Sequence, residues 1–480
     1  MSTDVHPLRI AGELFAGDGT TTGSFEVRSP YDDALIGRVP MCTTADVDRA
    51  VASARSALHT NPLPQWKRAQ ILDMAAVRLA ARRDEFAEAV CREAAKPIRT
   101  ARVEAERAVG TFQFAAAEAR KLSGEMIPLD AMAAGEGKLG FTLRVPIGVV
   151  GAIAPFNFPL NLVVHKVAPA IAAGCPVVLK PASQTPFSSI LLAEMLIDEC
   201  GLPAEYLHVV TGGGSTVGNA LVDHPDIALI TFTGSPQVGW GIRARAPRKR
   251  VGLELGNNAP VIIEPDSKWL VAADKIRMAG FGHAGQSCIS TQRIFVHSTI
   301  ANAFTDALAE RVQTLVVGDP MAEATEVSAL ISRSERDRVK SWIDEAVAGG
   351  ARVVCGGEVN GEGVLIPTVL ADVQHDMKVC AGEVFGPVVC IAAYDDLDEA
   401  LRLANDSSFG LQAAIFTPDI GKALKAIRTL DFGGVLVNEV PTFRADHQPY
   451  GGLRDSGNTR EGPAFSVKEM TEIRMIMINE

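Results

Sequence analysis

The sequence predicts an α/β protein, with a doubly wound, Rossmann-like domain followed by a second α/β domain. From about residue 144, short runs that are apolar throughout alternate with helical stretches, which is typical of a parallel sheet covered on both faces. A second series of this kind starts near residue 259. Two strands lead into glycine-rich turns, where such sheets bind nucleotides. The 480 residues suffice for this organisation, at about 100 to 200 residues per domain.

The region from residue 44 to residue 122 is expected to be helical. Apolar residues recur at three- and four-residue steps between Thr44 and Leu58, and Thr44 is the expected N-cap. The charged, alanine-rich stretch from Trp66 to about Leu122 continues as helices.

Predicted strands then alternate with predicted helices. In the first series, strands are expected at 147–154, 176–180, 206–210, 227–233 and 250–256. The intervening helices are expected at 160–173 and 187–200, shortly after Gly214 and after residue 233. In the second series, strands are expected at 259–265, 288–297, 351–357, 388–394 and 433–438. The chain shows no repeat of fixed period.

Composition and charge argue against several classes of partner. The net charge of -11 is spread along the chain, and the densest basic stretch, 246–250, has no interleaved aromatic residues, so nucleic acid is not expected as a partner. No apolar run reaches the ~18 to 20 residues that span a bilayer, and the first residues lack a signal-peptide pattern. Eight cysteines without a C-x-x-C pair indicate reduced thiols rather than disulfides or zinc ligands. The sequence predicts a cytoplasmic protein without a metal site.

Two glycine-rich turns follow predicted strands of the first series. They are TGGGSTVG (211–218) and TFTGSPQVG (231–239). Neither has the G-x-G-x-x-G spacing, and either alone fits a glycine turn without a ligand about as well. Two such turns in one sheet favour a bound nucleotide.

Cys288 stands apart from the other cysteines because small and polar residues surround it, in HAGQSCIS (283–290). A buried, inert thiol is the ordinary fate of a cysteine. A nucleophilic thiol instead needs access and polar neighbours that stabilise the thiolate, which Gly285, Gln286 and Ser287 offer. We therefore interpret Cys288 as a nucleophile.

Glu254 and Asn157 are the candidate partners of this thiol. Glu254 ends an otherwise apolar strand, where burial should raise its pKa as a general base near neutral pH requires. Asn157 lies on a proline-flanked turn after a strand, and its amide is a candidate oxyanion donor. Considered alone, Glu254 could be a surface residue at a strand end, and Asn157 could be a residue that forms a turn. Together the three residues indicate acyl chemistry.

These residues and their order resemble the aldehyde dehydrogenase superfamily, and the similarity covers nearly the whole chain. The matching segments are PQWKRAQIL (64–72), APFNFPLN (154–161), LKPASQTP (179–186), TFTGS (231–235), LELGNNAP (253–260), GQSC (285–288), GEVFGPVV (382–389) and PYGGLRDSG (449–457). By this resemblance Cys288 is the nucleophile, Glu254 the general base and Asn157 the oxyanion donor. The cofactor is NAD or NADP.

The resemblance also assigns residues to this dinucleotide. Lys180 would hold the adenosine ribose, Gly214 and Ser235 would lie beside the pyrophosphate, Glu383 would bind the nicotinamide ribose, and Phe385 would pack beside the nicotinamide.

A sixth position, Ser183, bears on the choice between the two cofactors. Many NAD-preferring members have a glutamate three residues after the ribose-binding lysine, and Ser183 stands there instead. Without that negative charge a 2′-phosphate is not repelled, so NADP should be accepted.

The family fold implies three parts. These are a discontinuous nucleotide-binding domain (1–123 and 146–255), a catalytic domain (256–462) and a small β bridging element (124–145 and 463–480). Members of the family form dimers or tetramers, so a homodimer or homotetramer is expected.

The implied mechanism has two half-reactions. The Cys288 thiolate adds to an aldehyde, and the thiohemiacetal gives hydride to the nicotinamide and becomes a thioester. Water activated by Glu254 then releases a carboxylic acid. A CoA-acylating enzyme generally lacks this base, a thioesterase would not need the nucleotide residues, and a non-catalytic member of the fold would have lost one of the three catalytic residues.

The substrate is expected to be a small aldehyde with an anionic phosphono, carboxy or sulfo group. By resemblance, Arg107, Phe158, His165 and Arg444 lie along the substrate tunnel, where an arginine binds such anions in bidentate fashion. Arg444 could instead form a structural ion pair with Asp446. The alternative substrate is a neutral small hydroxyaldehyde such as lactaldehyde.

Overall fold

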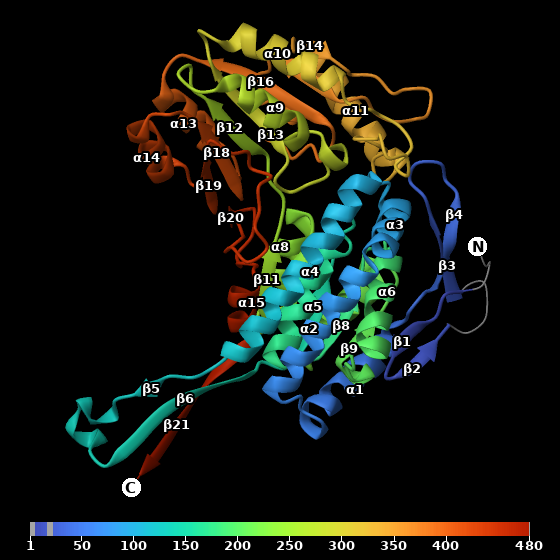
Figure 1. Ribbon diagram of the computed structural model, residues 1–480, viewed down its shortest axis with the longest axis vertical. Coiled ribbons are helices and arrows are strands. Elements are labelled where there is room, and N and C mark those ends of the chain that lie inside the picture. Colours follow the sequence, from blue (N-terminus) through green and yellow to red (C-terminus); the bar gives the residue numbers. More distant parts are fainter. Residues whose placement is uncertain (1–4, 17–22, 480) are drawn as a thin grey trace.

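The computed structural model describes residues 5–16 and 23–479 and shows a five-stranded body, a seven-stranded body and a projecting arm (Figure 1). The predicted α/β fold, with one Rossmann-like and one further α/β domain and a small β element, is confirmed. The predicted nucleotide-binding domain, which begins at residue 1, and the predicted bridging element, which ends at residue 480, extend outside the described residues.

The five-stranded body is built on a parallel sheet in the order β11-β10-β7-β8-β9. Its strands are β7 (Val149–Ile153), β8 (Val177–Lys180), β9 (Leu207–Val209), β10 (Ile227–Thr233) and β11 (Arg250–Glu254). The order reverses at β7, which is the point at which doubly wound sheets bind ligands at the carboxyl ends of their strands.

Helices cover both faces of this sheet. They are α1 (Thr44–Thr60), α2 (Gln65–Ala81), α3 (Arg83–Ala94), α4 (Ile98–Lys121), α5 (Asn161–Ala173), α6 (Phe187–Glu194), α7 (Asn219–Asp223) and α8 (Pro236–Arg245). Two short hairpins, β1 (Leu8–Ile10) with β2 (Glu13–Phe15) and β3 (Ser24–Arg28) with β4 (Leu35–Pro40), lie beside them (Figure 1). No helix in the part of the chain that the structure describes is long and apolar enough to cross a bilayer.

The predicted N-cap of the first helix is wrong by one residue. Thr43 caps α1: its hydroxyl accepts from the backbone N–H of Asp46, and the Asp46 carboxylate accepts from the backbone N–H of Thr43. This reciprocal capping box satisfies two N–H groups at once, which Thr44 cannot do with Val47 three residues later.

The seven-stranded body has the strand order β14-β15-β16-β13-β12-β18-β19. The strands are β12 (Ala259–Ile263), β13 (Thr291–His297), β14 (Arg352–Cys355), β15 (Thr368–Ala371), β16 (Val388–Tyr394), β18 (Gln412–Phe416) and β19 (Gly434–Val437), and β14 alone among them is antiparallel to its neighbour. The strands β15 and β18 were not expected from the sequence. Helices α9 (Trp269–Ala279), α10 (Ala301–Gln313), α11 (Arg333–Ala348), α13 (Leu397–Asn405) and α14 (Ile420–Thr429) pack around the sheet (Figure 1).

The arm is a three-stranded antiparallel sheet that projects from the five-stranded body (Figure 1). It consists of β5 (Met126–Ile127), β6 (Lys138–Pro146) and β21 (Thr471–Asn479), with β6 in the middle. The helix that precedes β21, α15 (Pro463–Glu469), packs against α4 and α5 rather than within the arm.

Candidate active site

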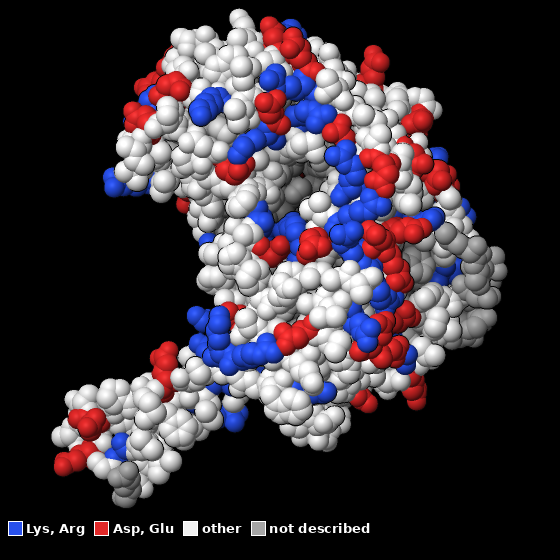
Figure 2. Space-filling model, in the orientation of Figure 1, with Lys and Arg blue, Asp and Glu red and all other residues white. Residues whose placement is uncertain are grey.

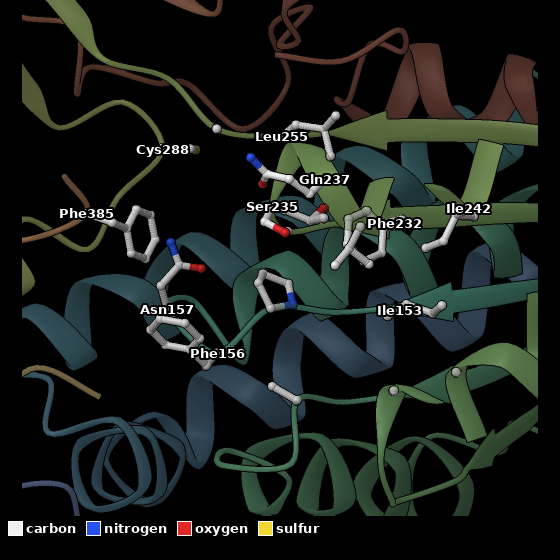
Figure 3. Close-up of a pocket in the computed structure, with 18 of the residues that line it drawn as sticks. Ile153, Phe156, Asn157, Phe232, Ser235, Gln237, Ile242, Leu255, Cys288 and Phe385 are labelled. Carbon is white, nitrogen blue, oxygen red and sulfur yellow. The ribbon is translucent and has the colours of Figure 1, made fainter. Parts of the chain in front are cut away.

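A cavity of about 970 Å³ lies where β7, β8 and β10 end, and residues of both bodies line it. Seven residues predicted from the sequence meet there: Asn157, Lys180, Gly214, Ser235, Cys288, Glu383 and Phe385. Figure 3 shows Cys288, Asn157 and Phe385 at one end of the cavity and Ile153, Phe232 and Ile242 at the other. An elongated ligand can therefore reach from the first sheet to the thiol.

Cys288 lies between a short helical turn, Gly282–Gly285, and the start of β13. His283, Ala284 and Gly285 all have positive φ, and a Cβ on Gly285 would come within 2.1 Å of the Gly386 carbonyl oxygen. Only glycine fits at that position, which brings the cysteine loop against the segment carrying Phe385. Of the eight cysteines, Cys288 alone is not fully buried.

The sulfur of Cys288 lies 2.8 Å from the hydroxyl oxygen of Tyr450. Burial raises the pKa of the thiol to about 12, while the hydrogen bond with Tyr450 and the charge of Arg444 lower it. The neighbours named by the sequence do not contact the sulfur in this way. The Gln286 side chain donates to the His283 carbonyl and accepts from the backbone N–H of Ile331.

Glu254 is the last residue of β11 and is 3% exposed. Neither carboxylate oxygen has a hydrogen-bond partner among the described residues. Burial and the nearby Glu461 raise the pKa of Glu254 well above its ordinary value, whereas Arg444 and Lys166 oppose the rise. A raised pKa makes the ionised form of this carboxyl group a stronger base, and that form can take a proton from water.

Asn157 lies on the loop between β7 and α5, and a buried ion pair holds that loop. Lys96 pairs with Glu104 and also donates to the Asn157 carbonyl. Glu104 in turn accepts from the backbone N–H groups of Leu160 and Asn161, at 2.9 and 3.1 Å. The Asn157 amide donates one hydrogen bond, of 2.9 Å, to the Gln286 carbonyl, and its second N–H is left for a ligand.

The residues assigned to the dinucleotide fit such a ligand. Lys180 is buried at the end of β8, and its amine donates only to the Pro181 carbonyl among the described residues. A Cβ on Gly214 would meet open space, so backbone there can approach a phosphate. Burial raises the pKa of Glu383 to about 7, and one of its oxygens accepts from the backbone N–H of Asn257. Phe385 has φ of +49° and packs edge-to-face on Phe156.

Ser183 does not line this cavity, although Ala182 and Gln184 do. Its hydroxyl donates to the Gly212 carbonyl at 3.0 Å. The hydroxyl therefore ties the turn after β8 to the glycine-rich turn that precedes Gly214.

A second, smaller cavity of about 160 Å³ lies on the other side of Cys288. Arg107, Phe158 and Arg444 line it, as the sequence predicted for a substrate tunnel, and so does Tyr450. His165 does not line it. It is buried behind the wall, where its ring contacts Asp446 at 3.0 Å and burial lowers its pKa.

The two arginines are already paired with carboxylates. Arg107 donates two hydrogen bonds to Asp446, of 2.8 and 3.2 Å. Arg444 donates to Glu461 at 3.1 Å and stacks on the ring of Tyr450, with its guanidinium carbon 3.8 Å from the ring centroid. The alternative pairing of Arg444 with Asp446 is wrong, because Arg107 takes that carboxylate. The Nε of Arg444 is buried without a partner among the described residues.

Three residues of the site were not identified from the sequence: Tyr450, Glu461 and Lys166. The Lys166 amine donates to Thr233 at 2.6 Å and to Glu461 at 3.3 Å. Lys166 and Arg444 lower the pKa of Glu461 to about 2, against the effect of burial. The only signal for Tyr450 was its place in the PYGG segment.

Comparison with known proteins agrees with this geometry. The model of the aldehyde dehydrogenase family matches residues 17–476. The chain is 46% identical over 460 residues to a 3-sulfolactaldehyde dehydrogenase of Priestia megaterium, covering 96% of each chain. It is 37% identical over 467 residues to a lactaldehyde dehydrogenase of Methanococcus aeolicus, covering 96% of this chain and 99% of the relative. A solved glyceraldehyde-3-phosphate dehydrogenase of Methanocaldococcus jannaschii, complexed with NADP, superposes with a TM-score of 0.90 at 36% identity, covering 95% and 99% of the two chains.

Proposed function

Because the chain belongs to the aldehyde dehydrogenase family, we propose that it oxidises a small anionic aldehyde to the acid through a thioester on Cys288. Its activity is that of an NAD(P)-dependent aldehyde dehydrogenase. The proposal concerns the substrate and the residues that act on it.

The acylation half-reaction begins with the Cys288 thiolate. Its sulfur forms a bond to the aldehyde carbon, and the free N–H of the Asn157 amide, with the backbone N–H of Cys288, stabilises the negative charge on oxygen. Preorganised donors of this kind contribute ~2.7 to 4 kcal/mol each. A nicotinamide bound beside the thiol would supply the acceptor for the hydride that leaves that carbon. Lys180, Glu383 and the open backbone at Gly214 would hold the dinucleotide.

The deacylation half-reaction depends on Glu254. Its carboxylate takes a proton from a water molecule, whose oxygen adds to the thioester carbon. The bond to sulfur then breaks, Cys288 leaves as thiolate and the product forms as the carboxylic acid. The acid and Glu254 then each release a proton to solvent, which gives the carboxylate product and restores the base. A buried carboxylate without hydrogen-bond partners is suited to take that proton.

The buried guanidinium of Arg444 carries the proposal of an anionic substrate. It lines the small cavity beside Cys288, and its Nε has no partner in the described chain. A sulfonate, carboxylate or phosphonate in this cavity would form a charge-assisted hydrogen bond with the Arg444 guanidinium. The cavity of about 160 Å³ admits only a short substrate. The 3-sulfolactaldehyde dehydrogenase relative supports the same substrate class.

A neutral hydroxyaldehyde is the second candidate. Asp446 and Glu461 already balance the charges of Arg107 and Arg444, which favours a substrate without charge. The lactaldehyde dehydrogenase relative supports this alternative.

A substrate panel with arginine variants distinguishes the two candidates. We expect sulfolactaldehyde or a carboxyaldehyde to have a higher kcat/KM than lactaldehyde, propanal or benzaldehyde. Loss of one charge-assisted hydrogen bond in Arg444→Leu should raise KM for the anionic substrate about 30-fold. Arg444→Lys keeps a charge for Glu461 and is the matched control for the ion pair. If KM for anionic aldehydes is unchanged in Arg444→Leu, or if lactaldehyde is the best substrate, the anionic assignment is wrong.

We further propose that the arm joins copies of this chain into a homodimer or homotetramer. Apolar side chains are exposed on it, namely Met126, Met132, Leu139, Leu143, Ile473, Met475, Met477 and Ile478. Figure 2 shows that the arm carries few charged residues on the visible face. A partner strand or sheet would cover this surface. We also propose that the protein is cytoplasmic, where its eight cysteines would stay reduced.

A further inference from the structure

Tyr450 is held firmly beside the sulfur of Cys288. Its side chain is 2% exposed, and its hydroxyl oxygen is 2.8 Å from Sγ. The Arg444 guanidinium stacks on one face of the ring. The backbone of Tyr450 pairs with that of Glu461 through two hydrogen bonds, of 3.1 and 2.6 Å. A phenol fixed at both its ring and its backbone has a defined direction toward the sulfur.

We propose that Tyr450 is a further catalytic residue, whose hydroxyl donates a hydrogen bond to the Cys288 sulfur and stabilises the thiolate in both half-reactions. The inference rests on the proposed role of Cys288 as the nucleophile. It adds a donor that the resemblance to the family did not assign.

The residues nearest to Cys288 in the sequence cannot supply this stabilisation. The Gln286 amide is engaged with backbone groups, and the Ser287 hydroxyl accepts from the backbone N–H of Ile289. His283 is buried, both of its ring nitrogens lack partners among the described residues, and burial lowers its pKa so that it stays neutral. Tyr450 and the positive charge of Arg444 are the groups that favour the thiolate.

The electrostatics set the direction of the hydrogen bond. Burial and the neighbouring Cys288 raise the pKa of Tyr450 well above its ordinary value, so the phenol keeps its proton at neutral pH. Burial likewise raises the pKa of the thiol, to about 12, so an unassisted thiolate would be scarce. A neutral phenol beside a thiolate can only donate.

The phenol of Tyr450 lies where it can act on the sulfur in both half-reactions. Cys288 lines both cavities, whereas Tyr450 lines only the small one, so the phenol approaches the sulfur from the substrate side. When the sulfur bonds to the aldehyde carbon, negative charge moves from sulfur to the aldehyde oxygen and the hydrogen bond weakens. When the thioester breaks, the charge returns to sulfur and the bond is restored. A thiol with a lower pKa is also the better leaving group.

The test measures the thiol without turnover, by following inactivation with iodoacetamide against pH in wild type and Tyr450→Phe. Phenylalanine keeps the ring and its stack with Arg444 and removes only the hydroxyl. Because a hydrogen bond to a charged group shifts a pKa by about one unit or more, we expect the inflection to move up by about one pH unit. Below the inflection, alkylation should be about tenfold slower. A coincident profile, or a downward shift, overturns the inference.

A control variant and a labelled protein test whether the change in the alkylation profile comes from the Tyr450 hydroxyl. Tyr206→Phe removes another buried phenol hydroxyl, which donates to the Asn61 carbonyl at 3.1 Å, and it should leave the alkylation profile unchanged. Replacing the four tyrosines with 3-fluorotyrosine makes each phenol a stronger donor and should lower the inflection. An inflection that does not move contradicts the inference.

Cys288→Ala distinguishes a failure of the proposed nucleophile from a failure of the inference about Tyr450. If Cys288→Ala retains aldehyde oxidation, the proposed nucleophile is wrong and the role of Tyr450 fails with it. If Cys288→Ala is inactive but Tyr450→Phe matches wild type in both alkylation and turnover, only the inference about Tyr450 fails.

Discussion

Replacing Glu254 with glutamine should separate the two half-reactions of the enzyme. The Glu254 carboxyl group is buried without hydrogen-bond partners among the described residues, and it lies close to Gly451, where an added Cβ would be 2.7 Å from Oε1. Glutamine has nearly the same size, so this contact is preserved. The variant loses only the ability to accept a proton from water, and the Cys288 thiol can still be acylated.

The size of the effect follows from the role of a general base. Such a base contributes roughly 10²- to 10⁴-fold, so kcat should fall by about that factor while a stoichiometric burst of reduced nicotinamide remains. The thioester on Cys288 should accumulate. Wild type should show less of this thioester, because its deacylation is faster.

The same variant should change the pH dependence of stability. Burial raises the folded-state pKa of Glu254 above its ordinary value of 4.5, so its favourable contribution to stability is fully present below pH 4.5. The contribution is lost as pH rises through the folded-state pKa, because the charged form is disfavoured in the fold. Each unit of the raised pKa corresponds to about 1.4 kcal/mol. The free energy of unfolding of Glu254→Gln relative to wild type should therefore increase between about pH 4.5 and neutral pH.

Stopped-flow absorbance of reduced cofactor measures the burst, mass spectrometry of the intact chain measures the acyl-enzyme, and urea denaturation at two pH values measures stability. Glu93→Gln is the matched control, because Glu93 is also buried with a pKa raised to about 7 but accepts from Phe187 and Ser188, away from both cavities. It should not produce a burst. A steady-state rate of Glu254→Gln within about threefold of wild type would refute Glu254 as the base.

Three further predictions concern the cofactor and the arm. In Gly256→Ala the new Cβ would lie 2.2 Å from a Glu383 oxygen and would displace that side chain. The Kd for the cofactor, measured by fluorescence titration, should therefore rise about tenfold. Gly241→Ala, whose Cβ meets open space, should leave the Kd unchanged. Ser183→Glu should lower the ratio of kcat/KM for NADP to that for NAD by about tenfold or more through repulsion of the 2′-phosphate, and a ratio equal to that of Ser183→Ala would count against this role of the position. Met475→Asp together with Ile473→Asp would bury charge at the proposed interface and should reduce the assembled mass measured by sedimentation. Leu424→Asp on α14 should leave that mass unchanged. An unchanged mass in the double variant would exclude β21 from the contact.

The sequence predicted most of the fold because its strands are apolar throughout and alternate with helices. The strands β7, β8, β10, β12 and β13 all lie within the predicted ranges. The strands that were missed have weaker signals. Before and at the start of β15, Pro367 and Thr368 interrupt the apolar run of residues 364–370. β18 begins with the buried polar Gln412, whose side chain donates to the Pro441 and Phe443 carbonyls. Such compensation comes from the tertiary structure and is absent from the local pattern.

The residues of the candidate site likewise include some that the sequence indicated and others that only the fold reveals. Cys288, Glu254 and Asn157 could be proposed from residue types at strand ends and turns. Tyr450 could not, because it lies 162 residues from Cys288 in the sequence and only the fold brings the two together. The arginines were identified, but not their partners. The pairing of Arg107 with Asp446, and of Arg444 with Glu461, depends on side-chain positions that spacing does not encode.

These partners give the site a net charge that bears on the choice of substrate. The cluster beside Cys288 contains three cations (Arg107, Arg444 and Lys166) and two carboxylates that are paired with them (Asp446 and Glu461). His165 stays neutral because burial lowers its pKa, and the raised pKa of Glu254 favours its protonated form. Three positive and two negative charges leave an excess of one positive charge while Glu254 is protonated and Cys288 is still an uncharged thiol, which is the state before the thiolate forms. An anionic substrate neutralises that excess, whereas a neutral hydroxyaldehyde leaves it buried and uncompensated, at a cost in free energy. The pairing of each arginine therefore does not remove the case for an anion, because Lys166 shares Glu461 with Arg444.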